Sequence, residues 1–161
     1  MINGSNSMNY KHTQISYLML VVTLAVLALF AWVYITARAE PPSYYSGTNF
    51  AVTSIMALIV LILASFVSLQ VMIDEKYLRI KFGYGIYRKK FLLDDVMSAK
   101  SVKNHWYYGW GIRGWPWPKM WIYNVSGFDA VEIKLKNGKT YRIGTDEPQK
   151  LEQAILRSIK I

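Results

Sequence analysis

The residues that could do chemistry are few and widely spaced in this chain. There are only two histidines, His12 and His105, and no cysteine, so disulfides and thiolate metal sites are excluded. No second ligand stands near His105 at a metal-binding spacing, and a loop residue is expected there. The adjacent Asp94 and Asp95 are typical of carboxylates that cap or solvate a turn. The sequence therefore predicts no catalytic residue, no metal, no cofactor and no enzymatic activity.

Two long uncharged stretches mark out the amino-terminal half of the chain. They cover residues 15–37 and 50–73, and both are longer than the ~18 residues that indicate a membrane span. We predict two transmembrane helices there, preceded by a cytoplasmic tail at 1–14 and joined by an external loop at 38–49. The alternative for the first stretch is a signal peptide cleaved after the small-x-small sequence Ala37-Arg38-Ala39.

Basic residues close to the apolar stretches predict the orientation in the membrane. Six of them follow the second stretch within 17 positions, whereas loop 38–49 contains only Arg38. This basic cluster comprises Lys76, Arg79, Lys81, Arg88, Lys89 and Lys90. Lys and Arg remain on the cytoplasmic side of membranes. We expect a multi-pass protein of the inner cell membrane with both termini cytoplasmic, and a cleaved first stretch would leave the carboxyl-terminal domain on the same side.

Residues 74–161 have the pattern of a small strand-rich domain. Apolar and polar residues alternate over 77–82, and further strands are predicted at 86–91, 98–103, 120–124, 130–136 and 139–143. Asn137-Gly138 is typical of a two-residue type I′ hairpin turn. Asp146 is a candidate N-cap for a final amphipathic helix. The predicted fold class is membrane α plus β: a two-helix transmembrane hairpin, then a small antiparallel β-barrel or sandwich of six or seven strands capped by a carboxyl-terminal helix.

The segment 106–123 is unusually aromatic, with eight Trp and Tyr residues among glycines and prolines. One interpretation is that about half of the rings, such as Trp110 and Tyr123, are core residues. A second is that exposed rings and neighbouring basic residues enter the membrane interface. A third is a groove for a protein partner, because Trp, Tyr and Arg dominate interfaces. The candidate interface residues are Trp106, Tyr108, Arg113, Trp115, Trp117 and Lys119.

The basic cluster also has two interpretations. It could hold a lipid headgroup in a specific pocket, but Arg88, Lys89 and Lys90 are consecutive and cannot share one face of a strand. A general attraction to anionic lipid, combined with the role in orientation, fits the pattern better. Nucleic acid is not an expected partner, because the anchor holds these charges against the bilayer.

Several short motifs give the chain a family resemblance. They are Gly109-Trp110-Gly111-Ile112-Arg113, Asn124-Val125-Ser126-Gly127, Ala130-Val131-Glu132-Ile133, Gly138-Lys139 and Ile143-Gly144-Thr145-Asp146-Glu147-Pro148. With the apolar stretches before them, they resemble the small bacterial integral membrane proteins that carry a pleckstrin-homology-like domain, over residues 72–160. The resemblance implies a bent, partly open seven-stranded barrel capped by a carboxyl-terminal helix. It implies little about activity, since the family is largely uncharacterised and the fold hosts unrelated functions.

The sequence therefore favours a membrane-anchored binding or scaffolding module that recruits a protein partner at the cytoplasmic face. The alternative is an envelope or surface sensor that reads anionic lipid directly. An accessory subunit of a transporter or membrane enzyme is also compatible with the sequence, although neither apolar stretch contains a charged residue that would indicate an ion path.

Overall fold

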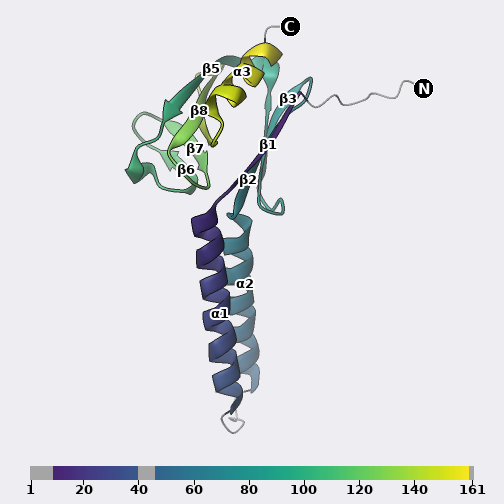
Figure 1. The fold of residues 1–161 in the computed structure, drawn as a ribbon, viewed down its shortest axis with the longest axis vertical. Coiled ribbons are helices and arrows are strands. Elements are labelled where there is room, and N and C mark those ends of the chain that lie inside the picture. The colour runs from purple at the N-terminus through teal and green to yellow at the C-terminus, as the bar shows by residue number, and fades with distance from the viewer. Residues whose placement is uncertain (1–8, 40–45, 160–161) are drawn as a thin grey trace, which may run out of the picture.

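The computed structural model describes residues 9–39 and 46–159. Two helices, α1 (Tyr17–Ala39) and α2 (Ser46–Ser65), lie side by side and lead at one end into a domain of strands (Figure 1). In the described part of the chain, only Tyr17–Ala37 forms a helix both long and apolar enough to span a membrane, and the apolar part of α2, Phe50–Ser65, is shorter. Residues 1–8 of the predicted tail and 40–45 of the predicted loop lie outside the described residues.

The predicted second span, residues 50–73, is not one continuous helix. Helix α2 ends at Ser65, and β2 (Ser68–Ile73) follows it almost directly. Within β2 the apolar Leu69, Val71 and Ile73 are buried, while the residues between them are half-buried. This two-residue alternation is typical of a strand with one face on a core. The sequence did not distinguish this strand from the helix before it, because Gln70 carries no charge and the stretch around it is apolar.

The predicted amino-terminal tail contributes a strand to the domain. Strand β1 (Tyr10–Ile15) pairs antiparallel with β2, so that Tyr10 lies opposite Ile73 and Ile15 opposite Ser68. The side-chain amide of Gln14 also donates a hydrogen bond to the backbone carbonyl of Ser126, 3.1 Å away. The folded unit is therefore larger than the predicted range 74–161, because it includes strands on both sides of the helix pair.

Two sheets form the domain. The first contains β1, β2, β3 (Tyr77–Phe82) and β4 (Arg88–Leu92), in that order. The second has the order β5 (Val96–Lys103), β8 (Asp129–Leu135), β9 (Thr140–Gly144), β7 (Met120–Asn124) and β6 (Gly111–Trp115). All neighbours are antiparallel except β7 and β9, which are parallel. The sheets remain open rather than closing into a barrel, and η1 (Leu93–Asp95) connects one to the other.

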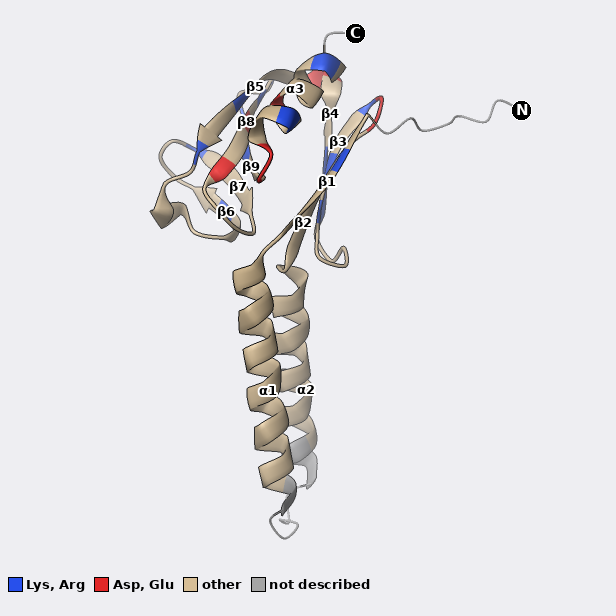
Figure 2. Ribbon diagram, viewed as in Figure 1, with Lys and Arg blue, Asp and Glu red and all other residues tan. Residues whose placement is uncertain are grey.

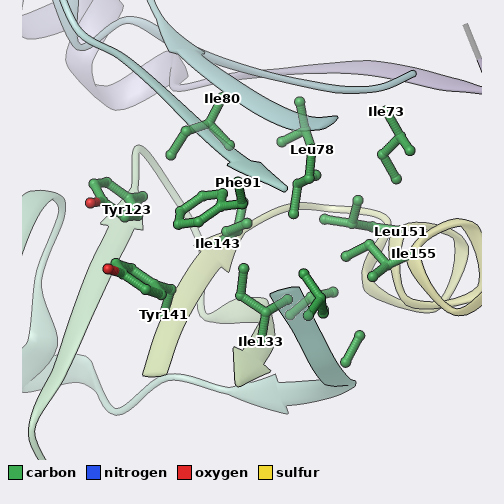
Figure 3. Close-up of a cluster of buried hydrophobic side chains, with 14 of the residues drawn as sticks. Ile73, Leu78, Ile80, Phe91, Tyr123, Ile133, Tyr141, Ile143, Leu151 and Ile155 are labelled. Carbon is green, nitrogen blue, oxygen red and sulfur yellow. The ribbon is translucent and has the colours of Figure 1, made fainter. Parts of the chain in front are cut away.

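The hydrophobic core lies between the two sheets. Side chains from both sheets, such as Ile80 and Phe91 from the first and Ile133 and Ile143 from the second, point toward one another (Figure 3). Helix α3 (Pro148–Ser158) contributes the fully buried Leu151 and Ile155 at one end of this core. Burial of these aliphatic side chains supplies the main stabilisation of the domain.

Two local details differ from the sequence prediction. Asn137 does not have the positive φ of a type I′ turn, and only Gly138 does, at +78°. The Gly138 amide donates to the Leu135 carbonyl, and the Leu135 amide donates to the Lys139 carbonyl, so the loop has three residues. Helix α3 begins after Glu147 rather than Asp146, and the Asp146 carboxylate instead contacts His12 of β1 at 2.5 Å.

The first prediction tests the contribution of β1. A chain that starts at Ser16 leaves β2 as an exposed edge and removes the half-buried Tyr10 and His12, so we expect the strand domain to lose about 2 kcal/mol or more of unfolding free energy. Thermal unfolding of the detergent-solubilised chain, followed by circular dichroism, measures this loss. The control is Lys11→Ala, because Lys11 is exposed on β1. Equal stability of the truncated and full chains would show that β1 is dispensable.

Candidate functional site

The aromatic segment divides into buried and exposed rings. Tyr108 and Tyr123 are buried, whereas Trp106 and Trp117 are 79% and 86% exposed. The expectation that Trp110 belongs to the core is wrong, since 39% of it is exposed, while Tyr123 does lie in the core. The segment therefore has both a structural part and a surface part.

The structural part is a small aromatic cluster on the side of the second sheet that faces away from the main core. The rings of Tyr108 and Trp115 are 4.8 Å apart, and Tyr107 lies 4.9 Å from Tyr108 and 5.6 Å from Trp115. Buried Met120 and Ile122 of β7 lie beneath them. Trp115 and Tyr108, both predicted interface residues, are therefore packing residues of this cluster.

The surface part is carried by the β6–β7 hairpin and the loop before it. Trp117 and Lys119 are exposed in the connection between the two strands, and Trp106 begins the short helix η2 (Trp106–Tyr108). In Figure 1, β6 lies at the edge of the second sheet nearest the helix pair, and β5 and α3 lie at the other end of the domain. The start of β6, at Gly111, is the end of this hairpin that approaches Phe66 after α2, and Trp117 lies in the loop at the opposite end of the hairpin.

Trp110 and Arg113 line a groove at the junction between the domain and the helices. The groove has a volume of about 480 Å³ and lies between the first turn of α1, at Met19, and the start of β6. Its lining residues are Met19, Phe66, Gly109, Trp110, Gly111, Ile112, Arg113 and Val125. Gly109 and Gly111 have φ of +64° and +101°, a backbone conformation that other residues rarely adopt. These two glycines allow the chain to turn tightly around Trp110. We call this feature the junction groove.

The basic cluster lies mainly on the outer face of the first sheet. Arg79 pairs with Lys90 and Lys81 with Arg88 across β3 and β4, so these four side chains share one face. Lys89 lies opposite Ile80, which points into the core, as expected for consecutive residues on a strand. Figure 2 shows this basic face beside β3, in contrast to helices on which no described residue between 17 and 37 or 50 and 65 is charged.

Part of this positive charge is already compensated. Arg79 forms a salt bridge of 2.7 Å with Asp74. The ring of Tyr77 has three cations within 6 Å of its centroid: Lys76 at 5.9 Å, Arg79 at 5.3 Å and Lys90 at 5.2 Å. The remaining lysines and arginines of the face are solvent-accessible, so their field is screened by salt. Five basic residues of the cluster nevertheless line one groove of about 560 Å³ on this sheet, namely Arg79, Lys81, Arg88, Lys89 and Lys90.

Sequence reasoning missed the turn between β3 and β4 as a functional feature. The hydroxyl of Tyr84 donates a 2.7 Å hydrogen bond to the backbone carbonyl of Leu61 in α2, and Ile86 is 67% exposed nearby in the sequence. Gly83 also lies so close to Ser65 that a side chain at position 83 would collide with the backbone. The sequence signal that could have identified this turn is the presence of a tyrosine and an isoleucine after a basic strand, since both residue types suit a membrane interface.

Two tyrosines in the described part of the chain, one half-buried and one buried, have a raised pKa. Burial raises the pKa of Tyr10 to about 12, with Glu147 acting in the same direction. Burial and the neighbouring Tyr87 hydroxyl also raise the pKa of Tyr123. Both tyrosines therefore stay neutral at physiological pH. His12 bridges Asp146 and Glu147 at 2.5 and 3.5 Å, and no three His, Asp or Glu residues among those described could hold a metal ion together.

Comparison of the chain with protein-family models, curated proteins and solved structures gives no match. The resemblance to bacterial membrane proteins with a pleckstrin-homology-like domain therefore stays a prediction from the motifs. The aromatic segment, the junction groove and the basic face are the features of the described chain that bear on its function.

The second prediction separates packing rings from surface rings. Trp115→Ser removes a ring that packs on Tyr108 and Met120, and we expect a loss of about 2 kcal/mol in unfolding free energy. Trp117→Ser changes an 86% exposed ring and should leave thermal unfolding nearly unchanged. Thermal unfolding of the two variants in the same detergent provides the measurement. The assignment would be contradicted by a Trp117 variant that is the less stable of the two.

Proposed function

We propose that the protein is a membrane-anchored, pleckstrin-homology-like binding module at the cytoplasmic face of the inner membrane, where it recruits a protein partner. The proposal has three parts: a helix pair that spans the bilayer, a domain on its cytoplasmic side, and an exposed aromatic surface on that domain. Each part depends on a different feature of the chain.

The helix pair is proposed to be a two-helix transmembrane hairpin. Both helices expose large apolar side chains, such as Leu24 and Leu27 on α1 and Ile55 and Leu58 on α2, which is unfavourable in water. Helix α2 has 20 residues and extends about 30 Å, and its shorter apolar part, Phe50–Ser65, would lie within the bilayer core. Because α2 lies along α1, a membrane that contains α1 would contain α2 as well.

Aromatic residues near both ends of the pair support this placement. Tyr17 begins α1 and is 74% exposed, and Trp32, 64% exposed, lies toward the other end. Amphipathic rings favour the headgroup level on both sides of a membrane. Tyr84 adds a third ring beside the end of α2 from which the domain emerges.

The cytoplasmic location of the domain is proposed from its charge. Pairing of β1 with β2 places the strands before α1 and after α2 at the same end of the helix pair. The basic face lies at that end, and the positive-inside rule assigns this side to the cytoplasm. The signal-peptide alternative is disfavoured by the same pairing, because cleavage after Ala39 would remove β1 from the domain.

The pleckstrin-homology-like fold is proposed from the family resemblance, together with two facing sheets and a carboxyl-terminal helix at one end of their core. The fold does not determine an activity. The observation that favours protein recruitment is the exposure of Trp106 and Trp117, which are large rings on a domain that already has a complete core. Tryptophan is enriched among the anchor residues of protein interfaces.

A direct contact with anionic lipid is the second candidate function. The observations in its favour are the basic face of the first sheet and the β6 edge of the second, which lies nearest the helix pair. Each basic residue near an anionic surface contributes at most about 1 kcal/mol, and salt screens this contribution. Dependence on salt therefore separates a lipid sensor from a protein-recruiting module.

The third prediction tests the topology. The chain lacks cysteine, so single cysteines report their own exposure to a membrane-impermeant maleimide. We expect Lys136→Cys, in the exposed β8–β9 loop, to be labelled only after cells are permeabilised, and Ser46→Cys, at the start of α2, to be labelled in intact cells. Labelling of Lys136→Cys in intact cells would place the domain outside.

The fourth prediction tests protein recruitment. Affinity purification of the full chain from native membranes, followed by mass spectrometry, should identify a specific protein neighbour that persists at high salt, since an apolar interface is little affected by ions. With the double variant Trp106→Ser, Trp117→Ser, the amount of that neighbour that co-purifies should fall at least tenfold, because interface aromatics commonly contribute about 2 kcal/mol or more to binding.

The control for this experiment is Lys100→Ser, which changes an exposed residue on β5, at the end of the second sheet away from the β6–β7 hairpin. This variant should retain the neighbour. If the double variant still captures it, or if capture disappears with added salt, protein recruitment by the aromatic surface is wrong.

A further inference from the structure

We infer that the junction groove is a binding site for one anionic phospholipid, with the acyl chains against the helix pair and the phosphate beside Arg113. This site is distinct from the aromatic surface proposed for a protein partner. It rests only on the proposed insertion of α1 and α2 in a membrane.

The apolar wall of the groove suits an acyl chain. Met19 lies in the first turn of α1, and Phe66 directly follows α2, so the groove opens where the apolar helices begin. Ile112 and Val125 extend the same apolar wall toward the domain. Lipid chains that surround the helices can therefore continue into the groove without crossing a polar barrier.

Arg113 supplies the charge that selects the headgroup. None of the groove's lining residues is acidic, and Arg113 forms no ion pair with any described residue. Its Nε atom donates a 3.1 Å hydrogen bond to the carbonyl of Trp110, which fixes the base of the guanidinium and leaves its other nitrogens available. A guanidinium binds phosphate oxygens through two parallel hydrogen bonds. Charge complementarity therefore favours a phosphate-bearing occupant over a purely apolar one.

The two glycines around Trp110 keep the charged side of the groove compact. A Cβ atom at Gly109 would lie 3.2 Å from Cζ of Arg113, so any larger residue would push the guanidinium away. A Cβ atom at Gly111 would lie 3.9 Å from the Phe66 ring, which shows how closely β6 approaches the end of α2. Trp110, with 39% exposure, is placed at the rim, where an indole ring suits the headgroup level.

The groove also has the right position for a lipid rather than for a peptide. It belongs to the β6 edge, which lies closer to the helices than the rest of the second sheet (Figure 1). In a bilayer that contains α1 from Tyr17 onward, this level coincides with the headgroups. Phospholipid is present there at high local concentration, so even a modest affinity would keep the groove filled.

The test uses the purified full chain in mild detergent and dioleoyl phosphatidylglycerol as the probe, with dioleoyl phosphatidylcholine as the neutral comparison. Native mass spectrometry measures the fraction of protein that carries one lipid. We expect phosphatidylglycerol to bind more tightly than phosphatidylcholine, and Arg113→Gln to weaken its binding about five- to tenfold. Arg113→Lys should restore part of this loss, because the charge is kept while the paired hydrogen bonds are lost.

Two matched arginine variants locate the site. Arg157→Gln changes an exposed arginine in the last turn of α3, at the end of the domain away from the helices, and should bind lipid as the wild type does. Arg88→Gln changes the basic face, and an effect as large as that of Arg113→Gln would move the lipid to that face and overturn the inference. Equal binding of the two lipids would also overturn the inference. A dimer of the wild-type chain that Ile112→Asp disrupts and the arginine variants do not would overturn it as well, because the groove would then be an interface between two copies of the chain.

A second measurement reports the position of the lipid without the Arg113 variants. The difference in fluorescence between the wild-type chain and Trp110→Phe gives the contribution of Trp110. Brominated phosphatidylglycerol should quench this contribution in the wild-type chain. Absence of that quenching contradicts the site. Extraction of the chain from membranes by alkaline carbonate would instead contradict the proposed anchoring, so failure of the anchor and failure of the groove give different results.

Discussion

The pairing of β1 with β2 is the constraint on which the rest of the structure depends. Strand β1 leads directly into α1, and β2 follows α2 after two residues, so their pairing holds one end of each helix together. The Ser16 amide donates to the Val67 carbonyl at 2.7 Å, which continues the ladder up to the helices. The domain is therefore connected to the helix pair by two covalent links and one sheet, rather than by a single linker.

This connection explains why surface features gather at the helix end of the domain. The turn that carries Tyr84 contacts α2, and the start of β6 approaches Phe66. Both segments are distant from the helices in sequence, yet the rigid ladder fixes their height relative to α1. The residues of the junction groove are then held at the level where the helices begin, as the proposed lipid site requires.

The same chain exposes apolar residues in one part and buries them in another. Leu58 of α2 is 56% exposed, whereas Leu78 of β3 is fully buried between the sheets. Exposure of the first kind on this scale is costly in water, and the proposed insertion in a bilayer would remove that cost, because lipid tails are as apolar as leucine. The aromatic segment shows the same division: Tyr123 is buried in the core, while Trp117 is exposed.

The sequence by itself determined the elements whose signal is local. Strand β3 was predicted at its observed bounds because Leu78, Ile80 and Phe82 alternate with polar residues, and the presence of a final helix and of one long apolar helix was likewise predicted. Only the tertiary structure decided that residues 68–73 are a strand, because their hydropathy continues that of α2 and one of their two partners, β1, lies more than 50 residues away. It also decided that Trp115 packs on Tyr108 while Trp110 and Arg113 line a groove with Met19. Composition indicates that such residues can bind, but which of them meet depends on contacts between distant segments, and no local pattern encodes those.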